Sequence, residues 1–188
     1  MREKLTITDK DIKAAKQMCP TSQKKIYDAY RVMVYSIAKR IFLNTGYAED
    51  ILQETFIDVF TKLGTFEGKH YQLGAWIKRI ATNRSLMMLR TAWISKKSDE
   101  EIEEVPYQSF EHQLHNNQEL EIALATLNPV SRSVLWLHDV EGYTHAEIGK
   151  MMKKTESFSK SQLARTHKKI KELLETHQTS NINVKEYR

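Results

Sequence analysis

The sequence is poor in several residue types whose scarcity excludes whole classes of structure. One cysteine, Cys19, stands in 188 residues, which excludes an internal disulfide framework and a zinc site made of four cysteines. Only six glycines and three prolines occur, and alternating apolar and polar runs are few, so strands and hairpins are not expected. No run of about 18 apolar residues exists, and the N-terminal residues are charged where a signal peptide would be apolar. These absences predict an all-α protein of the cytoplasm with no membrane insertion.

Catalytic and cofactor-binding patterns are missing as well. The sequence has no glycine-rich loop that could cradle a phosphate and no nucleophile elbow. His112 and His115 stand near Glu111, but a third metal ligand is not apparent, so a solvated pair is the preferred interpretation. We therefore predict a protein that is not an enzyme and that needs neither a metal nor another cofactor.

Charge divides the chain into three parts. Residues 20–92 carry 11 Lys and Arg against 6 Asp and Glu, and residues 144–188 carry 10 against 5, so each part has a net charge of +5. Between them, residues 93–119 hold 2 basic and 7 acidic side chains, a net charge of −5. We predict two small helical domains, at 20–93 and 118–175, joined by an acidic, flexible linker at 94–117. The basic domains favour a polyanionic partner such as DNA.

The stretch from Tyr143 to Ile170 predicts a helix-turn-helix, because two short helical patterns flank a tight turn and the second is strongly basic. At about 100° per residue, the apolar side chains of the second helix fall on one stripe: Leu163, Ile170 and Leu174. Small, polar and basic side chains spread over the opposite side: Lys160, Ser161, Ala164, Arg165, Lys168 and Lys169. The apolar stripe can pack on a core while the opposite side meets DNA.

Apolar spacing predicts three helices in the N-terminal domain. The first includes Ile26 to Ile41 and ends before Asn44, where Gly46 suits a C-terminal cap. The second runs from about Ala48 to Leu63, a loop follows over 64–74, and the third helix is expected over 75–93.

The second of these helices has an unusual outer face. Carboxylates and an amide stand there at i, i+3, i+4 and i+7 spacing around one apolar residue. We call this set the acidic strip: Asp50, Gln53, Glu54, Ile57 and Asp58. A solvated face with a stray isoleucine is the simpler interpretation. The alternative is a docking surface, on which the carboxylates meet Lys or Arg of a partner and Ile57 supplies the desolvated centre.

The third helix aligns an indole, guanidinium groups and an amide in one narrow band: Trp76, Arg79, Asn83 and Arg90. Such a face suits unpaired DNA, because an aromatic ring can support an unpaired base and an asparagine can read a base edge. A buried tryptophan flanked by solvated arginines explains the spacing equally well. The loop before the helix adds an aromatic residue, a lysine and His70, and could form a pocket for an extruded base.

Three segments in series resemble the extracytoplasmic-function sigma factors of bacterial RNA polymerase. The first is Ala48 to Phe56, with the sequence Ala-Glu-Asp-Ile-Leu-Gln-Glu-Thr-Phe. The second is Ala75 to Asn83, with the sequence Ala-Trp-Ile-Lys-Arg-Ile-Ala-Thr-Asn, followed by Arg90. The third is the helix-turn-helix from Thr144 to Ile170. Order, spacing and chain length all agree with that family, and the resemblance covers about residues 20–92 and 118–175.

The resemblance implies a role for each surface. The acidic strip would bind the clamp helices of the largest polymerase subunit, and the linker would run through the path of the nascent RNA. The third helix and the loop before it would melt the minus-ten promoter element and capture a flipped base, through His70, Trp76, Arg79, Asn83, Arg84 and Arg90. The basic helix of the helix-turn-helix would read the minus-thirty-five element, through Lys160, Ser161, Gln162, Arg165, Lys168 and Lys169. An anti-sigma factor would cover the docking faces.

The sequence departs from the family pattern at a few positions. An aspartate is usual four positions after the asparagine of the family, and Met87 stands there instead. In the helix-turn-helix, Lys154 and Ser159 occupy positions that are often apolar, and we expect Phe158 to compensate by packing into the turn. Residues 1–19 and 176–188 match nothing in the family.

The predicted function is that of a dissociable subunit that binds core polymerase and directs promoter recognition and DNA melting. Two other functions are open at this point. One is an autonomous regulator that binds duplex DNA as a dimer, for which palindromic half-sites and tight binding without polymerase are expected. The other is a helical interaction protein that binds only other proteins.

Overall fold

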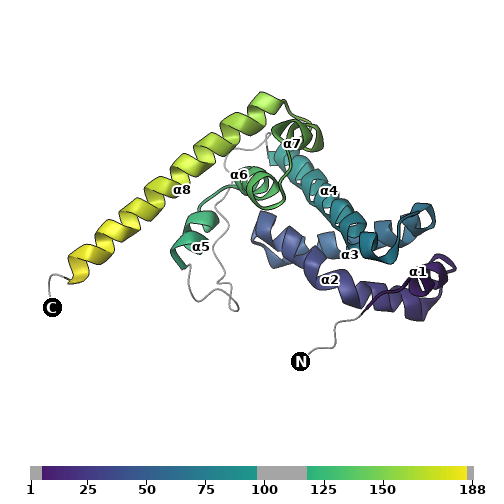
Figure 1. Cartoon of the computed structure of the whole chain (residues 1–188). Coiled ribbons are helices and arrows are strands. Elements are labelled where there is room, and N and C mark those ends of the chain that lie inside the picture. The colour runs from purple at the N-terminus through teal and green to yellow at the C-terminus, as the bar shows by residue number, and fades with distance from the viewer. Residues whose placement is uncertain (1–5, 97–117, 186–188) are drawn as a thin grey trace. The chain divides into compact units, whose positions relative to one another are not determined.

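The described part of the N-terminal unit is built from α-helices (Figure 1). The computed structural model describes residues 6–96 and 118–185, which divide into a unit that ends at Met88 and a unit that begins at Leu89. The elements that begin in the first unit are α1 (Asp9–Lys16), α2 (Pro20–Phe42), α3 (Thr45–Lys62), a 3-10 turn (Leu63–Thr65) and α4 (His70–Lys96), and residues 89–96 of α4 belong to the second unit. Every regular element within the described ranges is helical, which confirms the predicted all-α class.

The core of this unit lies where α2 and α3 pack against each other. Val34 and Ile41 of α2 and Val59 of α3 have no exposed surface, and Ile51 is 1% exposed. Burying a side chain of this size stabilises the fold by about 1.5–3 kcal/mol. The buried faces of α2 and α3 thus leave the opposite side of α3 turned to solvent.

The junction between α2 and α3 differs from the expectation. α2 does end before Asn44, but its left-handed cap residue is Leu43, with a φ of 53°, and not Gly46. Asn44 instead starts α3, where its side chain accepts a hydrogen bond of 3.0 Å from the backbone N–H of Tyr47. Because asparagine is a strong N-cap residue, α3 starts at Thr45, before the expected Ala48.

α4 begins at His70, one turn before the expected start at Ala75. Gly74 suggested a loop, but it lies inside the helix, where a Cβ would come within 3.1 Å of the Tyr30 ring on α2. The glycine therefore permits a close approach of α4 to α2 and does not mark a turn. His70 and Tyr71 consequently belong to the first turn of α4.

The C-terminal unit contains the expected helix-turn-helix. Its elements are α5 (Gln118–Ala125), α6 (Pro129–Leu135), a π-helical turn (Trp136–Val140), α7 (His145–Met152) and α8 (Glu156–Lys185). Apolar side chains from these α-helices and the segments between them form its core: Ala123, Leu127, Val134, Leu137, Ile148 and Leu163. α7, the turn after it and α8 make up the helix-turn-helix.

Part of the sequence-based prediction lies outside the described residues. This applies to most of the predicted acidic linker at 94–117, and to Glu111, His112 and His115. Within the described ranges, no group of three or more His, Cys, Asp or Glu side chains is placed to hold a metal ion. None of the helices in these ranges is both long and apolar enough to cross a membrane.

α7 is capped at both ends by residues close to it in the sequence. At its start, Thr144 and Glu147 form a capping box, in which the Glu147 carboxylate accepts a hydrogen bond of 2.8 Å from the Thr144 backbone N–H. Hydrogen bonds from Thr144 lower the pKa of Glu147. At its end, Lys153 adopts a left-handed backbone with a φ of 54°. A lysine in this conformation is strained, because its Cβ approaches the backbone.

We expect Lys153→Gly to stabilise the helix-turn-helix by about 1 kcal/mol, because glycine avoids this strain. Lys153→Ala removes the same charge but keeps the Cβ, so its stability should equal that of the wild type. Hydrogen exchange of the α7 backbone amides in the full chain measures both variants. Equal protection in the glycine and alanine variants would contradict the strain assigned to Lys153.

Candidate polymerase and DNA interfaces

The acidic strip occupies the solvent-facing side of α3. Asp50, Gln53 and Glu54 are exposed, and Ile57 is 60% exposed. Within the described part of the chain, the Asp50 side chain has no ion pair and no hydrogen bond. An exposed isoleucine gains free energy when a partner covers it, at about 25 cal/mol per Å² of apolar area. The strip thus combines an apolar centre with a charged rim, as docking surfaces do.

Arg84 joins the acidic strip to α4. Its Nε donates to a carboxylate oxygen of Asp58, and its Nη1 lies 3.3 Å from Oε2 of Glu54. The hydrogen bond from Arg84 lowers the pKa of Asp58, and the same bond raises the pKa of Arg84. Asp58 and Arg84 were assigned to two different interfaces from the sequence, yet they form one internal ion pair. Asp58 is accordingly half-buried at the edge of the strip.

The predicted DNA face of α4 has an exposed part and a packed part. Arg79 and Asn83 are exposed, whereas Arg90 is half-buried two turns after Asn83. Trp76 is half-buried, and its ring centroid lies 5.1 Å from that of Phe66 in the preceding loop. Trp76 therefore supports the loop by packing, and the exposed polar side chains beside it are Arg79 and Asn83.

The first turn of α4 adds an aromatic residue that was not among the candidates from the sequence. Tyr71 is 73% exposed, and its ring meets the His70 ring edge to face with centroids 5.6 Å apart. An exposed aromatic ring is a stacking surface for an unpaired base. The sequence shows an aromatic residue next to His70, but this segment was predicted to be a loop, so the direction of the aromatic ring could not be predicted.

α8 presents most of its candidate DNA-contacting side chains to solvent. The exposed ones are Lys160, Ser161, Arg165, Lys168 and Lys169. Nζ of Lys160 lies 2.6 Å from a carboxylate oxygen of Glu156, one turn earlier on the same helix. Exposed helix pairs of this kind contribute about 0.5 kcal/mol or less, so a DNA phosphate can replace the carboxylate.

Gln162 differs from its neighbours on α8. Its side chain is half-buried, and its Nε2 donates a hydrogen bond of 2.7 Å to Oγ of Ser131 on α6. Its Oε1 accepts a hydrogen bond of 3.3 Å from Nη2 of Arg165. Gln162 therefore fixes α8 on α6 and orients Arg165, a contact between helices that its position on one helix could not reveal.

The departures in the helix-turn-helix are accommodated by polar contacts. Ser159 is fully buried, and its hydroxyl lies 3.0 Å from Nδ1 of His145 on α7. Phe158 is half-buried, and Nζ of Lys154 lies 5.8 Å from its ring centroid. The His145 ring also stacks on His138 at 4.4 Å, and burial lowers the pKa of His145. A hydrogen bond between α7 and α8 thus takes the place of the usual apolar contact at Ser159.

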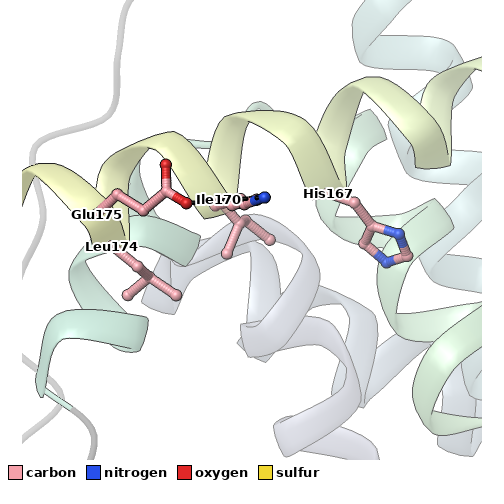
Figure 2. Close-up of a pocket in the computed structure, with 5 residues that line it drawn as sticks. His167, Ile170, Leu174 and Glu175 are labelled. Carbon is pink, nitrogen blue, oxygen red and sulfur yellow. Dashed lines mark ion pairs between the residues drawn. The ribbon is translucent and has the colours of Figure 1, made fainter.

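The apolar stripe of α8 continues beyond the core of the unit. Leu163 is buried, whereas Ile170 and Leu174 are half-buried and border an open hollow of about 610 Å³ (Figure 2). Lys171 also borders this hollow, with its Nζ 3.7 Å from Oε1 of Glu175. On a helical wheel the hollow lies on the side of α8 away from Ser161 and Arg165.

Two family models match the two parts of the chain. The model of Sigma-70 region 2 matches residues 26–94, and the model of Sigma-70, region 4 matches residues 117–170. These two regions in this order define a sigma factor of the sigma-70 class. Curated relatives narrow the class, and the chain belongs to the extracytoplasmic-function sigma factors of bacterial RNA polymerase.

The relatives match the chain over most of its length. The ECF RNA polymerase sigma factor SigE of Mycolicibacterium smegmatis is 31% identical over 156 residues, which is 77% of this chain and 58% of SigE. The ECF RNA polymerase sigma factor BldN of Streptomyces coelicolor is 29% identical over 160 residues, which is 80% of this chain and 59% of BldN. The chain thus spans about three fifths of the length of these relatives.

A solved structure supports the fold. The sigma factor RpoE in the complex with the anti-sigma factor NepR from Bartonella quintana matches with a TM-score of 0.55 and 21% identity. The match covers 81% of this chain and 96% of RpoE. At this level of identity the likeness shows a shared fold and nothing further.

Proposed function

We propose that the chain binds bacterial core RNA polymerase through the acidic strip and directs it to promoters. The observation that carries this proposal is Ile57, which is 60% exposed on α3 among carboxylates. An isoleucine in that setting favours a protein partner with basic side chains around an apolar contact. The sigma factor relatives supply the class of that partner, since they are named as RNA polymerase sigma factors.

The DNA-binding part of the proposal rests on two other helices. The exposed face of α4, with Tyr71, Arg79 and Asn83, would hold the unpaired strand of the minus-ten element, and the basic face of α8 would read the minus-thirty-five element. Phosphate contacts would supply most of the affinity and make it depend on salt. Base-edge contacts of about 1–3 kcal/mol each would set the sequence preference.

The chain would act without chemistry of its own, because the polymerase supplies the active site. This role places it in the cytoplasm, where the polymerase meets the chromosome. RpoE of Bartonella quintana was solved with the anti-sigma factor NepR. For this chain we propose an anti-sigma partner of the same kind, which competes with core polymerase for the acidic strip.

Asp50→Ala/Ile57→Ala is expected to weaken the binding of the chain to core polymerase about tenfold, because one rim charge and the apolar centre are lost together. These two positions are chosen because neither side chain takes part in the Arg84 ion pairs with Asp58 and Glu54. Fluorescently labelled chain titrated with core polymerase at one fixed salt concentration measures the affinity.

The matched control is Val32→Ala/Glu67→Ala. Val32 is also 60% exposed and Glu67 is exposed, so the control removes the same chemistry from other places in the same unit. It should bind core polymerase like the wild type, and equal weakening in both double variants would remove the acidic strip from the proposal. A wild type that binds duplex DNA tightly but not core polymerase would instead support the autonomous regulator.

A further inference from the structure

α1 lies before the residues that match Sigma-70 region 2, yet it is a fixed part of the N-terminal unit. Ile12 and Ala15 on its inner face are 5% and 1% exposed. Oδ2 of Asp11 lies 2.8 Å from Nζ of Lys25 on α2, and Thr8 and Asp11 form a capping box at the start of α1. No role was predicted for these residues from the sequence.

Asp9 joins the first turn of α1 to the first turn of α4. Its Oδ1 accepts a hydrogen bond of 2.8 Å from the backbone N–H of His70 and lies 3.3 Å from Nδ1 of the His70 ring. The backbone hydrogen bond is the largest contribution that lowers the pKa of Asp9. The first N–H groups of a helix lack partners within the helix, so a carboxylate from α1 satisfies one of them. Asp9 therefore fixes both where α4 begins and how His70 is turned.

Lys16, the last residue of α1, holds the beginning of the loop that leads into α4. Its Nζ donates a hydrogen bond of 2.5 Å to the backbone carbonyl oxygen of Phe66, whose side chain is 6% exposed. The backbone N–H of Lys69 donates to Oε1 of Gln72 at 2.8 Å. A Cβ at Gly68 would come within 2.7 Å of the Phe66 ring, so the loop folds tightly over that ring. Residues 66–71, here called the loop segment, are thus anchored to α1 at both ends.

We propose that α1 is a positioning element for the reading of the minus-ten strand, in which Asp9 and Lys16 hold the loop segment so that His70 and Tyr71 can receive an unpaired base. This inference rests on the proposed function. A stacking platform binds best when it is ordered beforehand, because ordering it during binding costs free energy. Tyr71 is 73% exposed and has little packing of its own, so the backbone contacts of the loop segment determine where its ring points.

Substitution of Asp9 distinguishes a positioning role from an effect of its charge alone, because the two predict opposite changes in DNA binding. A carboxylate beside a DNA-binding segment repels phosphates, so its removal through charge alone would strengthen DNA binding. The positioning role predicts the opposite effect for Asp9→Ala, which loses the acceptor for the His70 N–H. Asp9→Asn separates the two effects, because it removes the charge and keeps Oδ1 as an acceptor.

The experiment uses holoenzyme assembled from core polymerase and the full chain of 188 residues. The probe is a duplex DNA library randomised over both promoter elements, and the DNA retained by each holoenzyme is sequenced. We expect the wild type to enrich one base within the minus-ten element. Asp9→Ala should reduce that enrichment about tenfold, and Asp9→Asn should keep most of it. Preferences at the minus-thirty-five element should not change, because α8 belongs to the other unit.

Lys16 provides an independent pair of variants. Lys16→Met removes the donor to the Phe66 carbonyl and should reduce the same enrichment, and Lys16→Arg restores a donor and should recover it. A minus-ten preference in Asp9→Ala equal to that of the wild type, or DNA binding that is only stronger, overturns the positioning role. Loss of core polymerase binding in Asp9→Ala also overturns it, since that result shows a general folding role. If the wild type neither binds core polymerase nor selects DNA, the proposed function itself fails.

Discussion

Arg132→Ala is expected to destabilise the C-terminal unit by about 2–4 kcal/mol. Arg132 lies on α6 and is 7% exposed. Its Nη1 donates to the carbonyl oxygen of Leu127 and, at 3.5 Å, to that of Ala125. Carbonyl groups at the end of a helix lack donors within the helix, so Arg132 satisfies groups at the end of α5 and just after it. Alanine would remove these donors and leave a cavity where the long side chain packs.

Burial produces two opposing effects at Arg132. Desolvation lowers the pKa of Arg132 to about 10, so keeping the guanidinium charged inside the unit costs free energy. The hydrogen bonds to the carbonyl groups offset this cost. Arg132→Met keeps much of the apolar volume and removes the desolvation cost together with the hydrogen bonds. We therefore expect methionine to destabilise the unit by about 1 kcal/mol, which is less than the effect of alanine.

Hydrogen exchange of the full chain measures both variants. Amides of α6 and α7 report on the C-terminal unit, and amides of α2 and α3 provide an internal reference, because a chain of two units need not unfold in one step. Only the first group should lose protection. If alanine leaves α6 and α7 as protected as in the wild type, the hydrogen bonds of Arg132 do not hold α5 on α6.

Faces of single helices were easier to predict than contacts between helices. The spacing of Asp50, Gln53 and Ile57 placed them on the exposed side of α3, because one helix determines that side by its own period. The spacing could not pair Arg84 with Asp58, since that ion pair depends on how α4 packs against α3. Which side chains are available to a partner is therefore only partly readable from the sequence.

Helix ends were the least predictable feature of the fold. Gly46 and Gly74 were interpreted as a cap and as part of a loop, yet both lie inside helices. At Gly74 the reason is tertiary, because a Cβ there would lie only 3.1 Å from the Tyr30 ring of α2. α1 has eight residues and two buried side chains, too few for an apolar period to be recognised. The role proposed for Asp9 could therefore be inferred only after the contacts of α1 were known.

Gly149→Val is expected to weaken the binding of holoenzyme to a minus-thirty-five element about 100-fold. A Cβ at Gly149 would lie 3.0 Å from the carbonyl oxygen of Lys154 and 3.1 Å from the carbonyl carbon of Thr155. These are backbone atoms of the turn between α7 and α8, and the Lys154 N–H donates a hydrogen bond of 2.8 Å to the Gly149 carbonyl oxygen. Valine would overpack this turn at a cost of about 3 kcal/mol. The free variant relieves this strain by displacing α8, so restoring the DNA-binding geometry costs the same free energy, which corresponds to about 100-fold in an equilibrium constant.

The matched control for this prediction is Ala146→Val. Ala146 lies on the same helix and is exposed, so the same side chain there should cost only a few tenths of a kcal/mol through helix propensity. Both variants are titrated, as holoenzyme, against a labelled duplex that the wild type has selected. Whether the strain unfolds α7 or rotates α8, it removes Arg165 and its neighbours from the major groove. If Gly149→Val bound the duplex like the wild type, the position of α8 on the DNA would not depend on the tightness of this turn.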